Sequence, residues 1–459
     1  MRISTASLWL MIGLCACGPS SRTLPEKNYN MTLSFKTPEW TKQTSIYEVN
    51  VRQYTPAGTF TAFLSEMPRL RDMGVGTLWF MPITPIAQKN RKGTLGSYYA
   101  CSDYTSINPE FGTLDDFKQL VQQAHALGMK VIIDWVANHT GWDHRWTREH
   151  PDYYQKDSLT GDFKIASGMD DIIELDFTNP VLRKAMIEAM QFWVEECDID
   201  GFRCDLAFWV ELPFWREARY KLDAVKPLFW FGEYDELEKP EYAEVFDASY
   251  TWTWMHRAKD FYQQQGSMDS LLLVLDRYTH LPNDRMRSWF TTNHDENSWN
   301  GTEFEKYGDM ARGLAVFSAT WPGVPLIYSG QEKANVSRIK FFDKDTIRPG
   351  TDAESFSRFY SALLQLKKTN AALKADSAAK LIRLRTTAPG SVLAFLRTSG
   401  DSSVLVVLNL SSQSDLRFEI NDDQLTGRFR DLLSQSMNDF TADRSFLMQP
   451  WDYLIYTAE

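Results

Sequence analysis

The sequence has few cysteines and no concentration of positive charge. Its five cysteines form no CxxC pair, and outside residues 1–17 only Cys101, Cys197 and Cys204 remain, so neither a disulfide framework nor a zinc site is indicated. The net charge is −11 and no run of five basic residues occurs, which argues against binding nucleic acid through its phosphate backbone. Apolar material is abundant: 43% hydrophobic and 14% aromatic residues over 459 positions suffice for a barrel and a small second domain.

The first residues have the pattern of an export signal. Arg2 precedes an apolar run over 8–14 that is too short to span a bilayer, and small residues and cysteines follow it. The segment 14–17 (Leu-Cys-Ala-Cys) resembles a bacterial lipoprotein signal, in which Cys17 would be lipidated; Cys15 and an ordinary cleaved signal are the alternatives. We expect a signal over 1–17, a tether over 18–41, and a protein in the periplasm or at the cell surface that meets the membrane only through its lipid anchor.

After the tether, apolar strand-like runs alternate with helix-like segments. The clearest run, 131–134, breaks into the polar cluster around Asn138 and His139. Eight such runs are expected to be strands: 45–51, 77–82, 131–134, 201–205, 228–232, 246–250, 287–292 and 324–328. Eight strand–helix units over 42–372 predict a (β/α)8 TIM barrel, an α/β fold. The alternative is an open doubly wound sheet, but no glycine-rich phosphate motif follows the first run.

Two segments depart from this alternation. The connection over 141–179, between the third strand and its helix, is long enough to form an inserted subdomain. From 373 to 459 the pattern changes to short β-like runs, such as 392–396 and 404–408, separated by turns at 389–390 and 400–401. This tail predicts a C-terminal antiparallel β-domain.

Charged side chains follow several of the predicted strands. Arg203 and Asp205 end the fourth strand, Glu233 the fifth and Asp295 the seventh, and these strand ends converge in a barrel. Cleavage of a glycosidic bond needs two such carboxylates, one to attack the sugar carbon and one to protonate the leaving oxygen. Arg203 and Asp205 share one face of their strand, so the guanidinium can hold Asp205 ionised, and the pKa values of Asp205 and Glu233 should be pushed apart.

Four segments in this order resemble the signature regions of the α-amylase family, glycoside hydrolase family 13. They are 134–139 (Asp-Trp-Val-Ala-Asn-His), 201–205 (Gly-Phe-Arg-Cys-Asp), 232–233 (Gly-Glu) and 292–295 (Thr-Asn-His-Asp), within a likeness that runs from about 45 to 456. The resemblance implies a retaining mechanism on α-glucosidic bonds. Asp205 matches the nucleophile, Glu233 the general acid and base, and Asp295 the third carboxylate. The residues implied to bind the sugar are Tyr99, as an aromatic platform braced by Asp103, with His139, Arg203 and His294.

Two positions depart from the family pattern. Asn138 matches a calcium-binding residue of many α-amylases, but Glu174 stands where those enzymes usually have Asp. After Asp205, the apolar residues 206–209 replace the Lys-His pair of many endo-acting members. A calcium cage needs about six oxygen ligands, and only Asn138 and Glu174 are candidates, so we expect no required cofactor.

The sequence therefore predicts an exported hydrolase that cleaves α-1,4 bonds of starch or maltooligosaccharides. A transglycosidase and a cyclomaltodextrinase or neopullulanase-like enzyme are alternatives, because the segment after Asp205 is altered. A non-catalytic glycan-binding protein on the same barrel would be expected to lack one of Asp205, Glu233 and Asp295, and all three are present. The sequence leaves the oligomeric state open.

Overall fold

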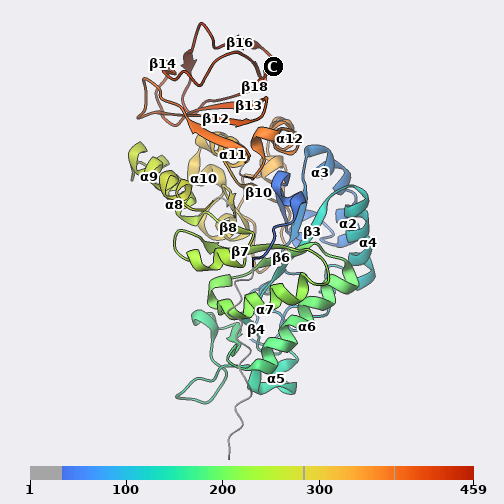
Figure 1. Cartoon of the computed structure of the whole chain (residues 1–459). Helices are drawn as coiled ribbons and strands as arrows, with labels where there is room; N and C mark the ends of the chain where they lie inside the picture. The colour runs from blue at the N-terminus through green and yellow to red at the C-terminus, as the bar shows by residue number, and fades with distance from the viewer. Residues whose placement is uncertain (1–33, 283–284, 377) are drawn as a thin grey trace, which may run out of the picture. The chain divides into compact units, whose positions relative to one another are not determined.

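The computed structural model describes residues 34–282, 285–376 and 378–459 (Figure 1). Eight parallel strands close into a barrel in the order β1-β10-β9-β8-β7-β6-β3-β2, which confirms the predicted fold class. The strands are β1 Ile46–Val49, β2 Thr77–Phe80, β3 Lys130–Trp135, β6 Gly201–Cys204, β7 Phe229–Asp235, β8 Ala248–Tyr250, β9 Met286–Trp289 and β10 Val324–Tyr328. Most of their residues are buried on both faces, as the continuous apolar runs of the sequence indicate.

The register of neighbouring strands determines which side chains meet inside the barrel. Asp134 on β3 is paired with Arg203 on β6, and Arg203 in turn with Phe231 on β7. On β1, Glu48 is paired with Trp79 of β2. Since paired residues on adjacent parallel strands point to the same face, the registers bring polar residues from separate strands to one region.

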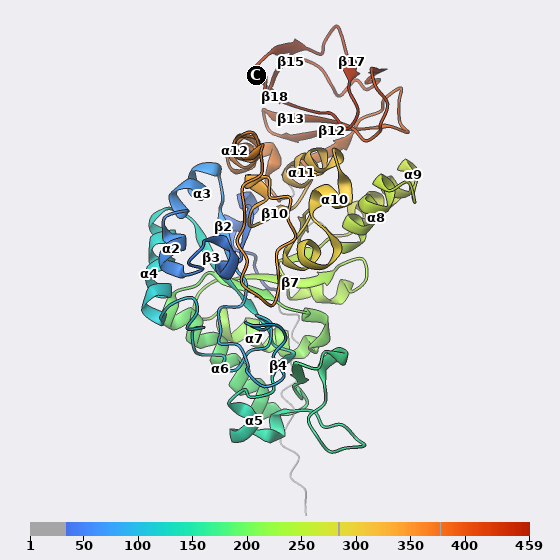
Figure 2. The same ribbon diagram turned by 180° about the vertical axis from the view of Figure 1, so that it is seen from behind.

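The barrel helices include α4 Leu114–Ala126, α6 Pro180–Cys197, α7 Leu212–Leu222, α8 Trp252–Tyr262, α9 Met268–Thr279, α11 Met310–Thr320 and α12 Ala353–Thr369 (Figure 2). Thr113 caps α4 reciprocally with Asp116, which explains why that helix begins where its sequence indicates. The segment 60–73, whose apolar residues recur at the spacing of a single helix, forms two helices, α2 Phe60–Leu64 and α3 Met67–Met73. Pro68 stands in the first turn of α3, the position that proline favours, and an uninterrupted helix would place it in the interior. The remaining α-helices are α1 Val51–Tyr54, α5 Trp146–Glu149 and α10 Glu303–Tyr307.

The long connection after β3 contains its own small sheet. β4 His139–Gly141 and β5 Ile172–Glu174 pair antiparallel, with His139 opposite Glu174. The helix α5 and two 3-10 turns lie between these strands, and Ala166 and Ile172 pack against Ala87 and Ala100 of the connection after β2. The insertion is therefore packed on the same side of the barrel as the loop after β2.

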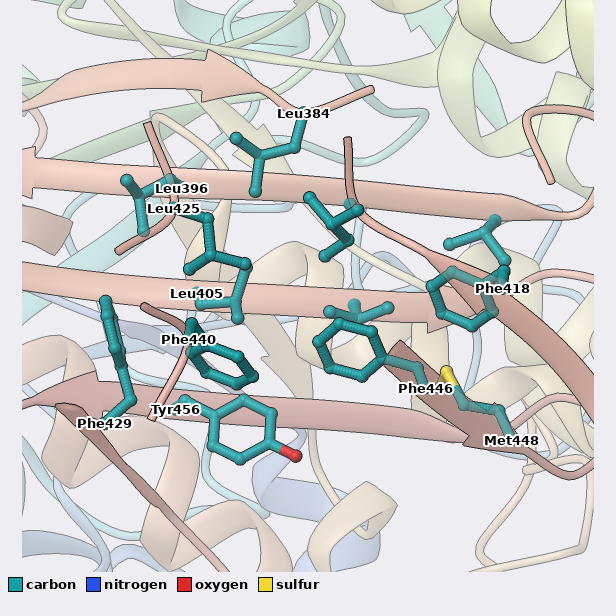
Figure 3. Close-up of a cluster of buried hydrophobic side chains, with 14 of the residues drawn as sticks. Leu384, Leu396, Leu405, Phe418, Leu425, Phe429, Phe440, Phe446, Met448 and Tyr456 are labelled. Atoms are coloured by element: carbon teal, nitrogen blue, oxygen red, sulfur yellow. The ribbon is translucent and has the colours of Figure 1, made fainter. Parts of the chain in front are cut away.

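The C-terminal part contains a six-stranded sheet of order β11-β12-β13-β18-β15-β16 and a two-stranded sheet, β14-β17. The bounds are β11 Lys380–Arg383, β12 Val392–Ser399, β13 Ser402–Asn409, β14 Leu416–Glu419, β15 Arg428–Asp431, β16 Met437–Asp439, β17 Ser445–Met448 and β18 Tyr453–Ala458. Leu396 faces the cluster of buried side chains shown in Figure 3, together with Phe418 and Phe446 of the smaller sheet. Its neighbour Phe395 points the other way, with its ring 5.0 Å from that of Trp321 beside α11. The central strands are thus covered on both faces.

Among the residues that the structure describes, no helix is long and apolar enough to cross a membrane. The predicted signal, with Cys15 and Cys17, lies outside the described residues.

Candidate active site

A cavity of about 510 Å³ lies at the C-terminal ends of the barrel strands and reaches the inserted subdomain. It is lined by five of the residues that the sequence singled out, namely Tyr99, His139, Asp205, Glu233 and Asp295. Segments up to about 200 residues apart in the sequence are therefore brought together here, because the ends of parallel barrel strands meet on one side.

Arg203 is the centre of this site. Its guanidinium is fully buried, and Nη1 donates to Asp205 Oδ1 at 2.8 Å and to Asp134 Oδ1 at 3.0 Å. Nη2 lies 2.9 Å from Glu233 Oε2. Since one planar group contacts three carboxylates, it holds Asp205 and Glu233 close to each other.

Burial dominates the acidity of the two predicted catalytic carboxyls. It raises the pKa of Asp205 to about 7, although Arg203 acts in the opposite direction. It also raises the pKa of Glu233 to about 7, again against Arg203 and with a further contribution from the charge of Asp205. The expected separation of the two pKa values is therefore absent from this structure. Both carboxyls are buried, so each is held near the point at which its protonated and ionised forms are balanced at neutral pH.

The carboxylate of Glu233 has a second partner in the backbone. The N–H of Leu206 donates to Glu233 Oε2 at 2.8 Å. Leu206 adopts a left-handed conformation with φ 40° and ψ 49°, which is strained for a residue with a side chain. The strained turn directly after Asp205 thus places a backbone N–H where it donates to the carboxyl of Glu233.

A hydrogen-bonded chain connects the site to the first barrel strand. Glu48 on β1 is fully buried and binds Nδ1 of His294, while His294 Nε2 lies 2.8 Å from the hydroxyl of Tyr99. Tyr99 in turn donates to Asp134 Oδ2 at 3.0 Å. Burial opposes protonation of His294, but the charges of Asp295 and Glu48 outweigh it and hold its pKa well above the ordinary value. Glu48 was missed by the sequence analysis, although a carboxylate inside an apolar strand was the available signal.

His139 and Asp295 line the cavity in different protonation states. Burial lowers the pKa of His139 to about 4, so the ring is neutral, and its buried Nε2 has no partner within the described residues. An unpaired donor or acceptor in a cavity wall is available to a ligand hydroxyl. Asp295 keeps 42% of its side chain exposed and lies 3.3 Å from His294 Nε2. Burial would raise its pKa, but His294 outweighs this effect and lowers it, so Asp295 remains a carboxylate.

Asp103 does not have the position expected of it. Its carboxylate accepts hydrogen bonds from the backbone of Thr105 at 3.0 Å and from Ser106 Oγ at 2.9 Å, and it lies 3.7 Å from Arg145. The residue that braces the hydroxyl of Tyr99 is Asp134. The side chain of Asp103 is used to close its own turn, and sequence proximity to Tyr99 gave no information on this.

Asn138 and Glu174 do not fit a calcium site. Oε2 of Glu174 lies 2.8 Å from the ammonium of Lys164, which would repel a cation, and the amide of Asn138 lies beside His139. Within the described residues no group of three or more His, Cys, Asp or Glu is placed to hold a metal ion. No role for calcium follows from this donor set, and the expectation that no cofactor is required stays a prediction.

Part of the remaining wall of the cavity comes from loops that carry no signature motif. Lys92, Asp171, Trp299, Phe341 and Phe342 line it, and none of them was singled out from the sequence. Trp299 belongs to η6 Glu296–Asn300, a π-helical turn directly after Asp295, and π turns are frequent at functional sites.

The fold and this site define a (β/α)8 protein with the carboxylate pair that glycoside hydrolases use. The catalytic-domain model of the alpha-amylase family matches residues 32–170 and 152–358, and the chain therefore belongs to the alpha-amylase family.

Several members of the family are similar over most of the chain. Alpha-amylase 2 of Dictyoglomus thermophilum is 25% identical over 67% of this chain and 58% of its own length. A cyclomaltodextrinase of Thermoanaerobacter pseudethanolicus is 26% identical over 79% of this chain and 69% of its own. The chain spans 58% and 64% of the length of two Dictyoglomus alpha-amylases. Among solved structures, a noncanonic maltogenic alpha-amylase from Thermotoga neapolitana superposes with a TM-score of 0.82 at 29% identity, covering 91% of this chain and 99% of that one. An alpha-amylase from Lactobacillus plantarum gives 0.79 at 28% identity, over 92% and 100%.

Proposed function

We propose that the protein hydrolyses α-1,4-glucosidic bonds of starch or maltooligosaccharides with retention of configuration. The observation that carries this proposal is the ion pairing of Asp205 and Glu233 with one guanidinium, Arg203. A retaining enzyme needs its two carboxyls about 5–5.5 Å apart, whereas an inverting one leaves about 6.5–9.5 Å for a water. A shared guanidinium favours the shorter separation.

In this mechanism Asp205 acts as the nucleophile. Its carboxylate attacks the anomeric carbon, the bond to the leaving oxygen breaks, and protonated Glu233 gives that oxygen a proton. A water then attacks the glycosyl-enzyme, passes a proton to Glu233 and releases Asp205. The starting state has Asp205 ionised and Glu233 protonated, and pKa values of about 7 make both of these forms accessible near neutral pH.

The neighbouring residues bind the sugar at the reacting carbon. Tyr99 offers a flat ring, stacked on His294 with their centroids 5.2 Å apart, against which an apolar sugar face can pack. His139 Nε2 can hydrogen-bond a ring hydroxyl, and ionised Asp295 can accept from two of them.

Sugar release from maltoheptaose tests the proposal. Glu233→Gln keeps the size of the side chain but cannot protonate the leaving oxygen, so the rate should fall by about 10²–10⁴-fold. Glu174→Gln is the matched control, because Glu174 lies outside the cavity and pairs with Lys164. Equal activity of Glu233→Gln and wild type would refute the assignment.

A transglycosidase is the second candidate. The side that receives the leaving group is apolar, with Leu206 and Trp209 in the cavity wall, and Trp209 is 36% exposed. Such a surface can hold a sugar acceptor in place of water. Chromatography of the maltoheptaose reaction separates the two activities. Products longer than maltoheptaose would favour transglycosylation, and their absence would favour hydrolysis.

A further inference from the structure

One loop after β2 closes a side of the cavity. Residues 88–97, here called the β2 loop, contribute Lys92 and Ser97 to the cavity wall. The loop is bound at both ends to segments that lie far from it in the sequence.

At one end the β2 loop is bound to the inserted subdomain. Lys92 Nζ lies 2.7 Å from Asp171 Oδ1 and 3.0 Å from Asp170 Oδ1, and the carboxylate of Asp171 is only 6% exposed. The carboxylate of Asp143 also accepts hydrogen bonds from the backbone of Gln88 and Lys89. Because Lys92 and Asp171 both line the cavity, their ion pair forms part of the wall.

At the other end the β2 loop is bound to the segment after β10. The N–H of Leu95 donates to the carbonyl of Phe342 at 2.9 Å, and the backbone and hydroxyl of Thr94 donate to Asp343 Oδ1 at 2.9 and 2.7 Å. Gly93 has φ +61°, and a Cβ there would lie 2.6 Å from Cβ of Phe342. The two segments are therefore in close contact, and the wall continues from Asp171 through Lys92 to Phe342.

Two contacts indicate the direction of this wall: Phe341 lies next to Tyr99, whereas Leu206 donates to Glu233. The leaving oxygen must meet Glu233, whose carboxyl is bound by Leu206, so the departing sugar lies against Leu206 and Trp209. In the proposed mechanism the sugar attached to Asp205 rests on Tyr99. Beyond Tyr99 follows Phe341, nearly parallel to it at 6.2 Å, and then Trp299 and Phe342, whose rings lie 5.4 and 5.1 Å from that of Phe341.

We propose that the β2 loop makes this cavity a pocket for the non-reducing ends of α-glucans, with Lys92 as a specificity-determining residue. The inference rests on the proposed function and names the part of the substrate that is bound. In an α-1,4 glucan the anomeric carbon of each unit is bonded toward the reducing end, so the sugars retained at Asp205 are those toward the non-reducing end. A wall beyond them leaves room for a chain end and excludes a chain that continues.

Three substrates of seven glucose units test the proposal with the wild-type protein. Maltoheptaose has a free non-reducing end, 4,6-O-ethylidene maltoheptaose has that end blocked, and the cyclic heptasaccharide has no end. Because a substrate that clashes with the wall loses binding in the transition state, we expect maltoheptaose to be cleaved at least about 10-fold faster than either other substrate. Equal rates would overturn the proposal and leave the hydrolase function standing. No release from any of the three would overturn the hydrolase function itself.

A pair of variants tests the role of Lys92. Lys92→Ala removes a side chain from the wall and its link to Asp171, so the rate ratio of blocked to free maltoheptaose should rise by about 5-fold or more. Lys89→Ala is the matched control on the same loop, because Lys89 lies over the ring of Trp142, outside the cavity lining. Circular dichroism of both variants checks the fold. A ratio that rises equally in both variants, or in neither, would overturn the assignment of Lys92.

Discussion

Asp205→Asn should make the protein more stable, and the gain should increase with pH. The side chain of Asp205 is 8% exposed, and burial raises its pKa from the ordinary 3.8 to about 7. An acid whose pKa is raised on folding binds more protons in the folded state between these two values. Its contribution to the free energy of unfolding is therefore favourable at low pH and is lost as pH rises toward 7. Asparagine has no such pH dependence.

The size of the effect follows from the two pKa values. An acid with a pKa near 3.8 when unfolded and near 7 when folded lowers the free energy of unfolding by about 4 kcal/mol between pH 4 and pH 8. The substitution also removes an acceptor from Arg203, which costs about 1–3 kcal/mol at every pH, although Asp134 and Glu233 still bind the guanidinium. The net gain should therefore be about 1–3 kcal/mol at pH 8 and absent or reversed at pH 5.

Urea denaturation followed by tryptophan fluorescence at pH 5, 6, 7 and 8 measures the difference in the free energy of unfolding between Asp205→Asn and wild type. Asp103→Asn is the control, and its effect on the free energy of unfolding should have the opposite sign. Burial alone would raise the pKa of Asp103, but hydrogen bonds from Thr105 and Ser106 outweigh it and hold the pKa below its ordinary value. Asp103 thus contributes stability above pH 4 that is lost on acidification, and its variant should be less stable than wild type across the range. If the advantage of Asp205→Asn were constant or fell with pH, the burial argument would be wrong.

Four further outcomes are expected. Glu48→Gln removes a charge that favours protonated His294, so the pKa of His294 should fall toward its ordinary value. The site would then lose the positive charge of His294 at pH 8 but keep it at pH 5.5, so kcat/KM should fall about 10-fold at pH 8 and little at pH 5.5. A pH profile would show this difference, and a uniform loss would contradict it. Trp209→His restores a polar group on the leaving-group side and should change the length distribution of products from starch, measured by chromatography. Chelation with EDTA should leave both activity and the urea midpoint unchanged, because Glu174 is paired with Lys164. Cys17→Ser should move the protein from the membrane fraction to the soluble one, and an unchanged distribution would argue against lipidation at that residue.

The charged residues at the strand ends could be predicted from the sequence, because strand periodicity is a local pattern and the barrel fold brings all strand ends to one side. Two residues of spacing place Arg203 and Asp205 on one face, and the barrel brings Glu233 to them. The contact of Glu48 with His294 depends on barrel closure between β1 and β10, across 246 residues of sequence. The ion pair of Lys92 depends on how two loops pack, which no periodicity encodes.

The acidity of Asp205 and Glu233 also depends on packing, because it is set first by burial and then by the charges of the whole site. The charged groups are Glu48, Asp134, Asp205, Glu233 and Asp295, against Arg203 and His294. Fully ionised, they leave an excess of negative charge in a region from which most water is excluded. Burial, with a contribution from the neighbouring carboxylates, raises the pKa of Asp205 and Glu233 to about 7. Protons retained in this way remove part of that excess, and in the proposed mechanism one of them is available for the leaving group. In the proposed reaction, positive charge develops on the sugar as the glycosidic bond breaks, and the same excess would stabilise it. The balance of charge that makes the site costly to bury is thus the property that suits it to the reaction.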